Sequence, residues 1–299
     1  MPYTYFGPYG TQFATQAEPA GGNTGLRPLG TVLVLPDGRE YRYALAGSAA
    51  RVAGNLYQSI VPVVEHSETV VDQVRAVGAT ALSSTLGAVL AAIDIYSEGY
   101  VSVNKVDGVG LGYRIRRAIA NGQAHAAVAS SGIITVNLAP GESNLVALVS
   151  TSELTYSRNR FHSTIIHASP PTAMLSGVAP WAATLSQYYY EQVRGLATVL
   201  ADGTLLAGKA VQASITTDGA VESAKTRIRT SATAAGDVTA FVQLTDQDGT
   251  NTTVAVGTIA ASTTADITGG VAYNAPLVGI CTKVNISTEY AQVDLRFLG

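Results

Sequence analysis

The sequence predicts an all-β protein made of antiparallel β-barrel or sandwich domains, with an extended N-terminal arm. Asp-Gly pairs next to runs of alternating residues favour β-hairpins, because Gly supplies the positive φ that a tight turn needs and Asp tolerates it. There are five such pairs: Asp37-Gly38, Asp107-Gly108, Asp202-Gly203, Asp218-Gly219 and Asp248-Gly249. Evidence for helix is confined to residues 67–77, a short and Val-rich segment.

Residues 1–30 are expected to form the arm. Pro and Gly recur through them, charge is almost absent, and neither helical nor strand periodicity is present. Aromatic residues gather at its start: Tyr3, Tyr5, Phe6, Tyr9 and Phe13. Disordered tails are usually rich in charge and poor in aromatics, which is the reverse of this composition. We therefore expect these five side chains to bind a neighbouring subunit; the alternative is plain disorder.

Successive hairpins are expected after the arm. The segment LGTVLVLPDGREYRYAL predicts the first, with Val32 and Val34 before the turn and Tyr41 and Tyr43 after it. Further strands are expected in five segments of the middle of the chain: ATALSST, GYVSVNKV, GLGYRIRRA, GIITVNLA and NLVALVS. The Pro-Pro connector SPPTAM then marks a plausible domain boundary.

The last third of the chain predicts two more hairpins and a closing strand. The hairpins are expected in SQYYYEQVRGLATVLADGTLLAGKAVQAS and in DVTAFVQLTDQDGTNTTVAVGTIAA. The final segment alternates through Val293, Leu295 and Phe297, as a strand with one buried face does.

Charge is scarce in the 299-residue chain, at 13% of residues. This is about half of the usual ~25%, so we expect other subunits to cover part of the surface. The net charge of −3 and the dispersed Lys residues argue against a nucleic-acid partner. The basic cluster of Arg114, Arg116 and Arg117 fits a solvated or interface surface better.

Neither secretion nor membrane insertion is expected. The N-terminus has no basic region followed by an apolar stretch, so it does not predict a secretory signal. Residues 76–93 approach the length of a membrane span, but they are rich in Gly, Ser and Thr, and two short strands fit them better. The single Cys281 cannot form an internal disulfide, which suits assembly in the cytoplasm.

No metal or cofactor site is predicted. Asp246, Asp248, Thr250 and Asn251 have the oxygen ligands of a calcium loop, but the Asp-Gly turn already explains their spacing. Four His residues offer no metal-ligand spacing: His162 and His167 fall on opposite faces of a strand, and we expect His66 and His125 to be solvated.

No enzyme is predicted either. Two carboxylate pairs, Glu65 with Glu68 and Asp94 with Glu98, are of the kind that a glycosidase uses, but nothing places them in a cleft. There is no G-x-S-x-G motif, and GVGLG at residues 108–112 lacks the spacing of a phosphate loop.

The run Tyr188, Tyr189 and Tyr190 has two interpretations. Alternation along a strand sends the outer two rings to one face and the middle ring to the other. The rings could line a carbohydrate-binding surface or pack on both sides of a barrel wall.

Three segments together resemble virion structural proteins of tailed bacteriophages, particularly capsid decoration (cement) proteins. They are LGTVLVLPDGREYRYALAG, YYYEQVRGLATVLADGTLLAGKAV and PLVGICTKVNISTEYAQVDLRFL. The resemblance implies one barrel made of residues 31–65 and 170–299, with residues 66–169 inserted as a second β-domain. A tandem arrangement split near the Pro-Pro connector is the alternative.

The resemblance also implies a function. It implies a virion protein that is assembled in the host cytoplasm, forms a homo-oligomer, expected to be a trimer, and stabilises the shell by contacts with the major capsid protein. It implies no catalytic residue. The alternative is a tail or head-fibre adhesin that binds host surface glycans. A triple-stranded stalk, long repeats or an exposed aromatic groove would favour it, and the sequence has neither of the first two. A virion enzyme that cleaves polysaccharides ranks third.

Overall fold

The computed structural model describes residues 27–118, 122–224, 275–284 and 289–297, and the backbone of six short strands outside these ranges. Among these residues the one helical element is a 3₁₀ turn, η1 (Val64–His66). All named strand pairs are antiparallel except one, so the predicted all-β class is confirmed. Residues 67–77, the weak helix candidate, contain the short strand β6 (Thr69–Val70) instead.

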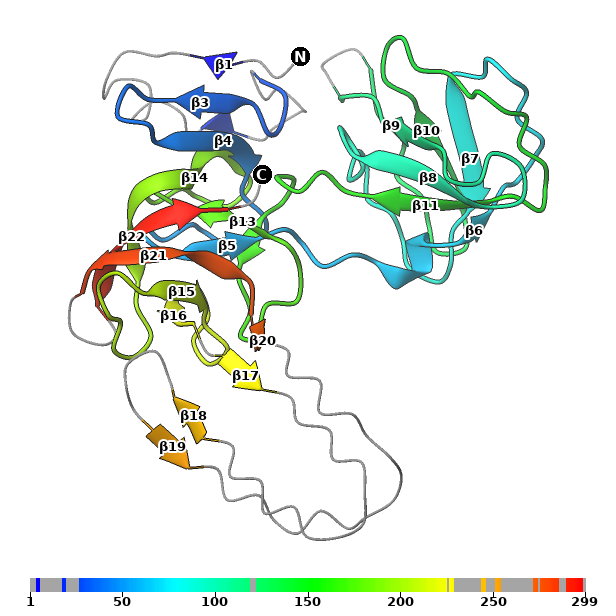
Figure 1. Cartoon of the computed structure of the whole chain (residues 1–299). Coiled ribbons are helices and arrows are strands. Elements are labelled where there is room, and N and C mark those ends of the chain that lie inside the picture. Colours follow the sequence, from blue (N-terminus) through cyan, green and yellow to red (C-terminus); the bar gives the residue numbers. More distant parts are fainter. Residues whose placement is uncertain are drawn as a thin grey trace, which may run out of the picture.

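A large curled sheet, shaped as a half-barrel, dominates one lobe of the molecule (Figure 1). Its main path runs through β1 (Thr4–Tyr5), β3 (Val32–Val34), β4 (Glu40–Leu45), β14 (Gln187–Leu200), β22 (Tyr290–Arg296), β21 (Leu277–Lys283), β15 (Ala210–Ala213) and β16 (Val221–Ser223). Four short strands join it from the side: β2 (Glu18–Pro19), β5 (Leu56–Gln58), β12 (Ile165–Ile166) and β13 (Leu175–Val178).

The long strand β14 organises this sheet because its two halves serve different neighbours. Its first half pairs with β4, and its second half pairs with β22. The register of the β4 pairing shifts between Gln192 and Arg194, and Gly195 next to the shift has a φ of 80°. Such a bulge bends a strand, and it lets β14 follow the curl of the sheet.

The lobe drawn on the opposite side of Figure 1 consists of two smaller sheets. One contains β6, β11 (Glu153–Ser157), β8 (Tyr100–Lys105) and β9 (Gly112–Arg114), and the other pairs β7 (Ala81–Thr85) with β10 (Ile133–Asn137). Their shared core is built entirely from residues between Val71 and Tyr156. The chain returns to the large sheet at Phe161, whose carbonyl accepts from the Leu45 N–H at 2.9 Å.

The Asp-Gly turns explain four of the five predicted connections. Gly38, Gly108 and Gly219 have φ between 75° and 84° and lie between strands that pair with each other. Asp248-Gly249 lies outside the described residues, but the strands on either side of it, β18 (Gln243–Thr245) and β19 (Asn251–Thr253), pair antiparallel. The remaining short strands, β17 (Thr226–Ile228) and β20 (Val271–Tyr273), also pair.

The hairpin predicted around Asp202-Gly203 is wrong. Strand β14, which precedes this turn, pairs with β4 and β22, whereas β15, which follows it, pairs with β16 and β21. The two C-terminal strands thus lie between β14 and β15 in the sheet. A turn sequence specifies only a local change of direction, and a distant segment of the chain took the place of the expected partner.

Candidate functional site

The five aromatic residues of the arm cannot be placed as a site. Tyr3, Phe6, Tyr9 and Phe13 lie outside the described residues, and only the backbone of Tyr5 is described, in β1, where it lies opposite Leu33 of β3. Their role in binding a neighbouring subunit stays a prediction.

The expectation that His66 and His125 are solvated is wrong, because both are buried, with at most 1% of their surface exposed. The His66 ring bonds through Nδ1 to the Tyr96 hydroxyl and through Nε2 to the Val89 carbonyl, 2.9 Å away. The Tyr96 N–H donates to Nε2 of His125 at 3.2 Å, so that nitrogen carries no proton. The polar neighbours of His66 and the turn region around His125 suggested exposure. Both rings turn inward instead and bond to groups of the lobe that contains β6 to β11, which we call the inserted lobe.

The His162 and His167 rings do not come together either. His167 is fully buried and uses both ring nitrogens on the backbone, with Gly219 N–H donating to Nδ1 at 2.6 Å. His162 is half-buried and bonds to the neighbouring Ser163 hydroxyl. Within the described part of the chain, no group of His, Cys, Asp and Glu has the arrangement of a metal site. Of the calcium-loop candidates, Asp246, Asp248 and Thr250 lie outside that part.

The carboxylates of Asp94 and Glu98 bind backbone and guanidinium groups instead of facing a cleft. The Asp94 carboxylate accepts from two backbone N–H groups, those of Ala124 and His125, at 2.7 and 3.2 Å. Glu98 is 3% exposed, accepts from the Leu29 N–H at 2.6 Å and pairs with Arg117 at 2.9 Å. Both carboxylates therefore have a structural role. Glu98 also links the inserted lobe to the segment that begins the large sheet, through the Leu29 N–H.

The three consecutive tyrosines pack on both sides of the sheet, which is the second of the two interpretations. Tyr190 and Tyr188 contact Tyr43 on one side, and Tyr188 lies parallel to it with ring centroids 5.3 Å apart. Tyr189 belongs to the core on the other side and is 2% exposed. The three tyrosines therefore do not form a carbohydrate-binding surface together.

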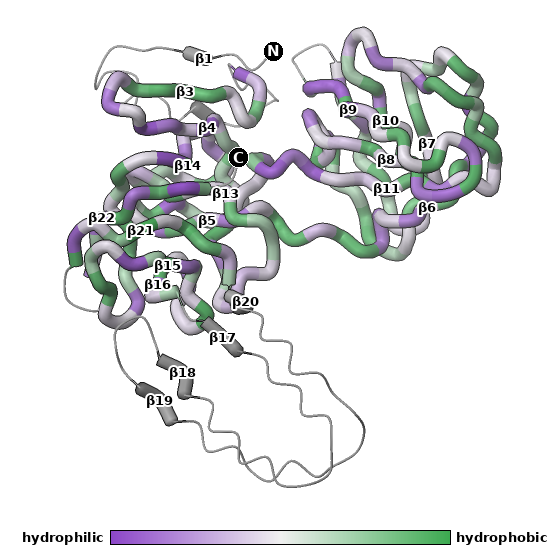
Figure 2. The backbone as a smooth tube through the Cα atoms, in the orientation of Figure 1, coloured by the Kyte–Doolittle hydropathy of each residue, from purple (hydrophilic) through white to green (hydrophobic). Residues whose placement is uncertain are grey.

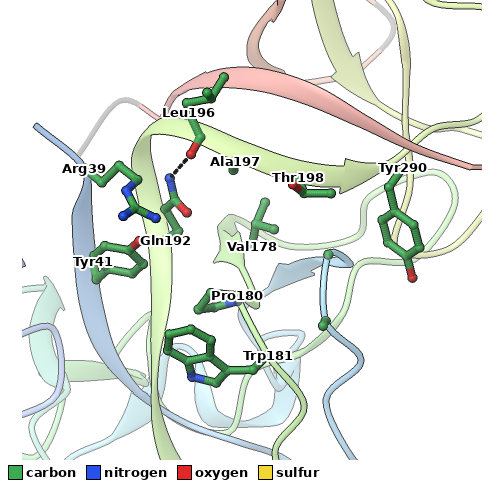
Figure 3. A pocket seen from close by; sticks show the side chains of 12 residues that line it. Arg39, Tyr41, Val178, Pro180, Trp181, Gln192, Leu196, Ala197, Thr198 and Tyr290 are labelled. Atoms are coloured by element: carbon green, nitrogen blue, oxygen red, sulfur yellow. Dashed lines mark hydrogen bonds between the residues drawn. The ribbon is translucent and has the colours of Figure 1, made fainter. Parts of the chain in front are cut away.

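A groove of about 480 Å³ opens on the large sheet (Figure 3). It is lined by Arg39, Tyr41, Ala53, Gly54, Val178, Pro180, Trp181, Gln192, Leu196, Ala197, Thr198 and Tyr290. These residues come from the hairpin of β3 and β4, from the turn before β5, from the last residue of β13 and the loop after it, from β14, and from the first residue of β22. Segments far apart in the sequence therefore build one concave surface, which no short motif could have revealed.

Two aromatic side chains flank this groove. Trp181 is 37% exposed and Tyr290 is 38% exposed, although large aromatic side chains are usually well buried. A Cβ on Gly54 would come within 2.4 Å of the Tyr290 ring, so only glycine lets the ring lie against this turn. Gly54 also has a φ of 79°, which favours glycine independently.

The polar side of the groove is held in place by the bulge in β14. The Gln192 side-chain N–H₂ donates to the carbonyls of Arg194, Gly195 and Leu196 at 3.0–3.3 Å. These bonds fix the orientation of the amide and leave its Oε1 as an acceptor on the groove side (Figure 3).

Two further polar side chains, Arg39 and Tyr41, stand beside Gln192 (Figure 3). Arg39 is the one charged side chain among the described lining residues, and its Nε donates to Asp37 at 2.6 Å. Burial raises the pKa of Tyr41 to about 12, so its hydroxyl is neutral at physiological pH.

An uncharged surface lies on the inserted lobe. Residues 76–93 and 118–141 contain no Asp, Glu, Lys or Arg. Strands β7 and β10 within them pair along five residues each, and Leu86 and Gly87 continue the ladder with Gly132 and Ser131. The large apolar side chains exposed on it, at 41–65%, are Val77, Val89, Leu90, Ile93 and Ile133. We call these two segments the uncharged surface; Figure 2 colours β7 within it green to white. Charged side chains of neighbouring segments border it, since Asp72 and Arg75 bond to the Ser83 hydroxyl and the Glu65 carboxylate lies beside Gly87.

Compared with protein-family models, with curated proteins and with solved structures, the chain gave no match. Among the described residues, no helix has the length and apolar character to cross a membrane.

Proposed function

We propose that this protein is a capsid decoration protein of a tailed bacteriophage. It binds the outer capsid surface as a homo-oligomer, expected to be a trimer, and stabilises the shell by contacts with the major capsid protein. The observation that carries the proposal is the uncharged surface, and the sequence resemblance to cement proteins gives the partner. The role proposed is structural, not catalytic.

The composition of the uncharged surface supports a docking role. Soluble monomers rarely expose large contiguous apolar patches, and the cores of protein interfaces are depleted in charge. Leu90 is 62% exposed and Ile133 is 55% exposed, within two hydrogen-bonded segments that have no charged residue. Covering these side chains with a partner removes apolar area from water, which stabilises the complex.

The mechanism of stabilisation is mass action. A protein that binds the closed shell, but not its separated subunits, lowers the free energy of the closed shell relative to the open one. Contacts that span several subunits add avidity, because the second contact of an oligomer forms at a high effective concentration. Neither effect needs a reactive group.

The first test changes the uncharged surface. In the double variant Leu90→Asp with Ile133→Asp, two carboxylates would have to be desolvated at the interface, so we expect shell binding to weaken by about tenfold or more. Co-sedimentation with shells that lack the protein measures it. The matched control is Val52→Asp with Leu185→Asp, two exposed positions of the large-sheet lobe at 50% and 57%. Equal binding by both double variants, with unchanged circular dichroism, would contradict the proposal.

The second measurement locates the protein in purified virions by electron microscopy. A decoration protein covers the shell in many copies. A few copies confined to the tail or to one vertex would overturn the decoration role and favour the adhesin.

A further inference from the structure

We propose that the groove between Trp181 and Tyr290 is a saccharide-binding site. It is separate from the docking role, because the groove lies on the large sheet and the uncharged surface lies on the inserted lobe. The inference therefore does not rest on the proposed function.

The apolar part of the groove suits the C–H face of a sugar ring. The negative face of an aromatic ring attracts the weakly positive C–H groups of a pyranose, and a flat ring offers a large contact at little entropic cost. Trp181 and Tyr290 expose more than a third of their surface, and Pro180, next to Trp181, and Val178 also line the groove (Figure 3).

The polar part suits sugar hydroxyls, which need both an acceptor and a donor nearby. The Oε1 of Gln192 is the acceptor, because the N–H₂ of the same amide is already engaged with three carbonyls. Arg39 supplies donors: its Nε binds Asp37, and the rest of its planar fork can donate to the groove. A purely apolar ligand would leave both groups desolvated and unpaired, which weakens binding.

The site is organised before any ligand arrives. Gly54 permits the position of the Tyr290 ring, and the β14 bulge fixes Gln192. Preorganised side chains lose little freedom when a ligand binds, so they favour affinity. The volume of about 480 Å³ lies in the range of small-ligand pockets and admits one or two sugar rings.

A second cavity does not meet the same requirements for binding a saccharide. It is larger, about 650 Å³, and it is lined by apolar residues such as Leu277, Ile280 and Phe297, with Arg160 and Arg296 as its polar side chains. It has no side-chain acceptor among its described lining residues, and it therefore lacks one of the two groups that sugar hydroxyls require.

The chain itself supplies the probe for the test. Trp181 is the single tryptophan of the 299 residues, so the intrinsic tryptophan fluorescence reports on the groove alone. The full chain is titrated with the methyl glycosides of glucose, galactose, mannose and glucuronic acid, and with maltose and lactose. We expect a saturable change in emission with at least one of them, at millimolar concentration.

Two variants test whether the change in tryptophan emission arises from binding in the groove. Tyr290→Ala removes an aromatic face and Arg39→Gln removes the charged donor, and each should weaken binding by about tenfold. Tyr100→Ala is the matched aromatic control, 55% exposed on the inserted lobe. Arg296→Gln is the matched control for arginine, because Arg296 also pairs with an Asp two residues earlier, at 3.2 Å. Both controls should bind as the native chain does.

Two results would overturn the proposal. One is the lack of a saturable change with every saccharide of the panel, both in fluorescence and in saturation-transfer NMR. The other is binding that the groove variants and their controls share equally. The Leu90→Asp, Ile133→Asp variant should retain saccharide binding while it loses shell binding, so a failure of one proposal is distinguishable from a failure of the other.

Discussion

At the scale of single residues, burial of polar groups explains the histidines better than their sequence neighbours do. His66, His125 and His167 are each at most 1% exposed, yet each ring binds backbone or hydroxyl groups. A buried polar group without a partner destabilises a fold by about 1–3 kcal/mol, so satisfied rings of this kind hold loops in place. Their chemistry is used inside the protein and not at a site.

His125 gives a prediction on pH. Burial lowers its pKa below the usual value of about 6.5, although the Ala126 carbonyl and Asp94 oppose the shift. Because the folded-state pKa is lower than the unfolded one, the neutral ring favours the fold above pH 6.5, and this contribution is lost as the pH falls toward the folded pKa. NMR titration of the His125 Cε1–H should give a midpoint below that of an exposed histidine; a midpoint at or above 6.5 would show that the ring is not held neutral.

At the scale of elements, alternation and turn chemistry predicted strands well and their partners less well. The hairpin around Asp37-Gly38 forms as expected, because both strands are adjacent in the chain. The strands on either side of Asp202-Gly203 form too, but β21 and β22 separate them in the sheet. Pairing depends on buried area and on the competition among all strands, and local patterns carry no information on that competition.

The arm offers a prediction at this scale. Deletion of residues 1–26 tests the arm. The shortened chain keeps Arg27, which bonds to the Tyr190 hydroxyl, and Leu29, which belongs to the core. The shortened chain keeps every described core residue of both lobes, so we expect it to fold. If the aromatic residues of the arm bind neighbours, shell binding should fall in co-sedimentation; undiminished binding would exclude that role.

The short strands β1 and β2 qualify the arm prediction. They pair with β3 and β14 of the same chain, two residues each. Their deletion exposes backbone groups of β3 at the edge of the sheet, and we therefore expect faster amide exchange at Val32–Val34 than in the intact chain.

At the scale of the whole molecule, the two lobes have separate cores. The inserted core uses residues from Val71 to Tyr156, and the cores of the large sheet use none of them. The two segments that connect the lobes lie side by side, since Ser59 of the first and Ser157 of the second line the same small cavity of about 270 Å³. Adjacent ends are what an inserted domain needs to fold without pulling on its host.

Excision tests this organisation. Replacing residues 62–158 with a short Gly-Ser linker should leave a folded large sheet, because its cores are intact, with some loss of stability since Leu29 N–H loses Glu98 as its acceptor. Circular dichroism and denaturant unfolding measure it. The shortened chain should still bind a saccharide that quenches Trp181 but should not bind shells. A chain that unfolds altogether would show that the two lobes depend on each other.

The sequence by itself determined the strand-rich class, four of the five Asp-Gly connections and the alternation of the three tyrosines between the two faces of a strand. These features depend on residues near one another in the chain, where periodicity and turn chemistry act directly. Only the tertiary structure decided the rest: that the C-terminal strands lie between β14 and β15, that His66 and His125 are buried, and that Trp181 and Tyr290 share a groove. Those outcomes depend on contacts between segments from about 25 to more than 100 residues apart, and no local pattern records which distant surfaces will meet.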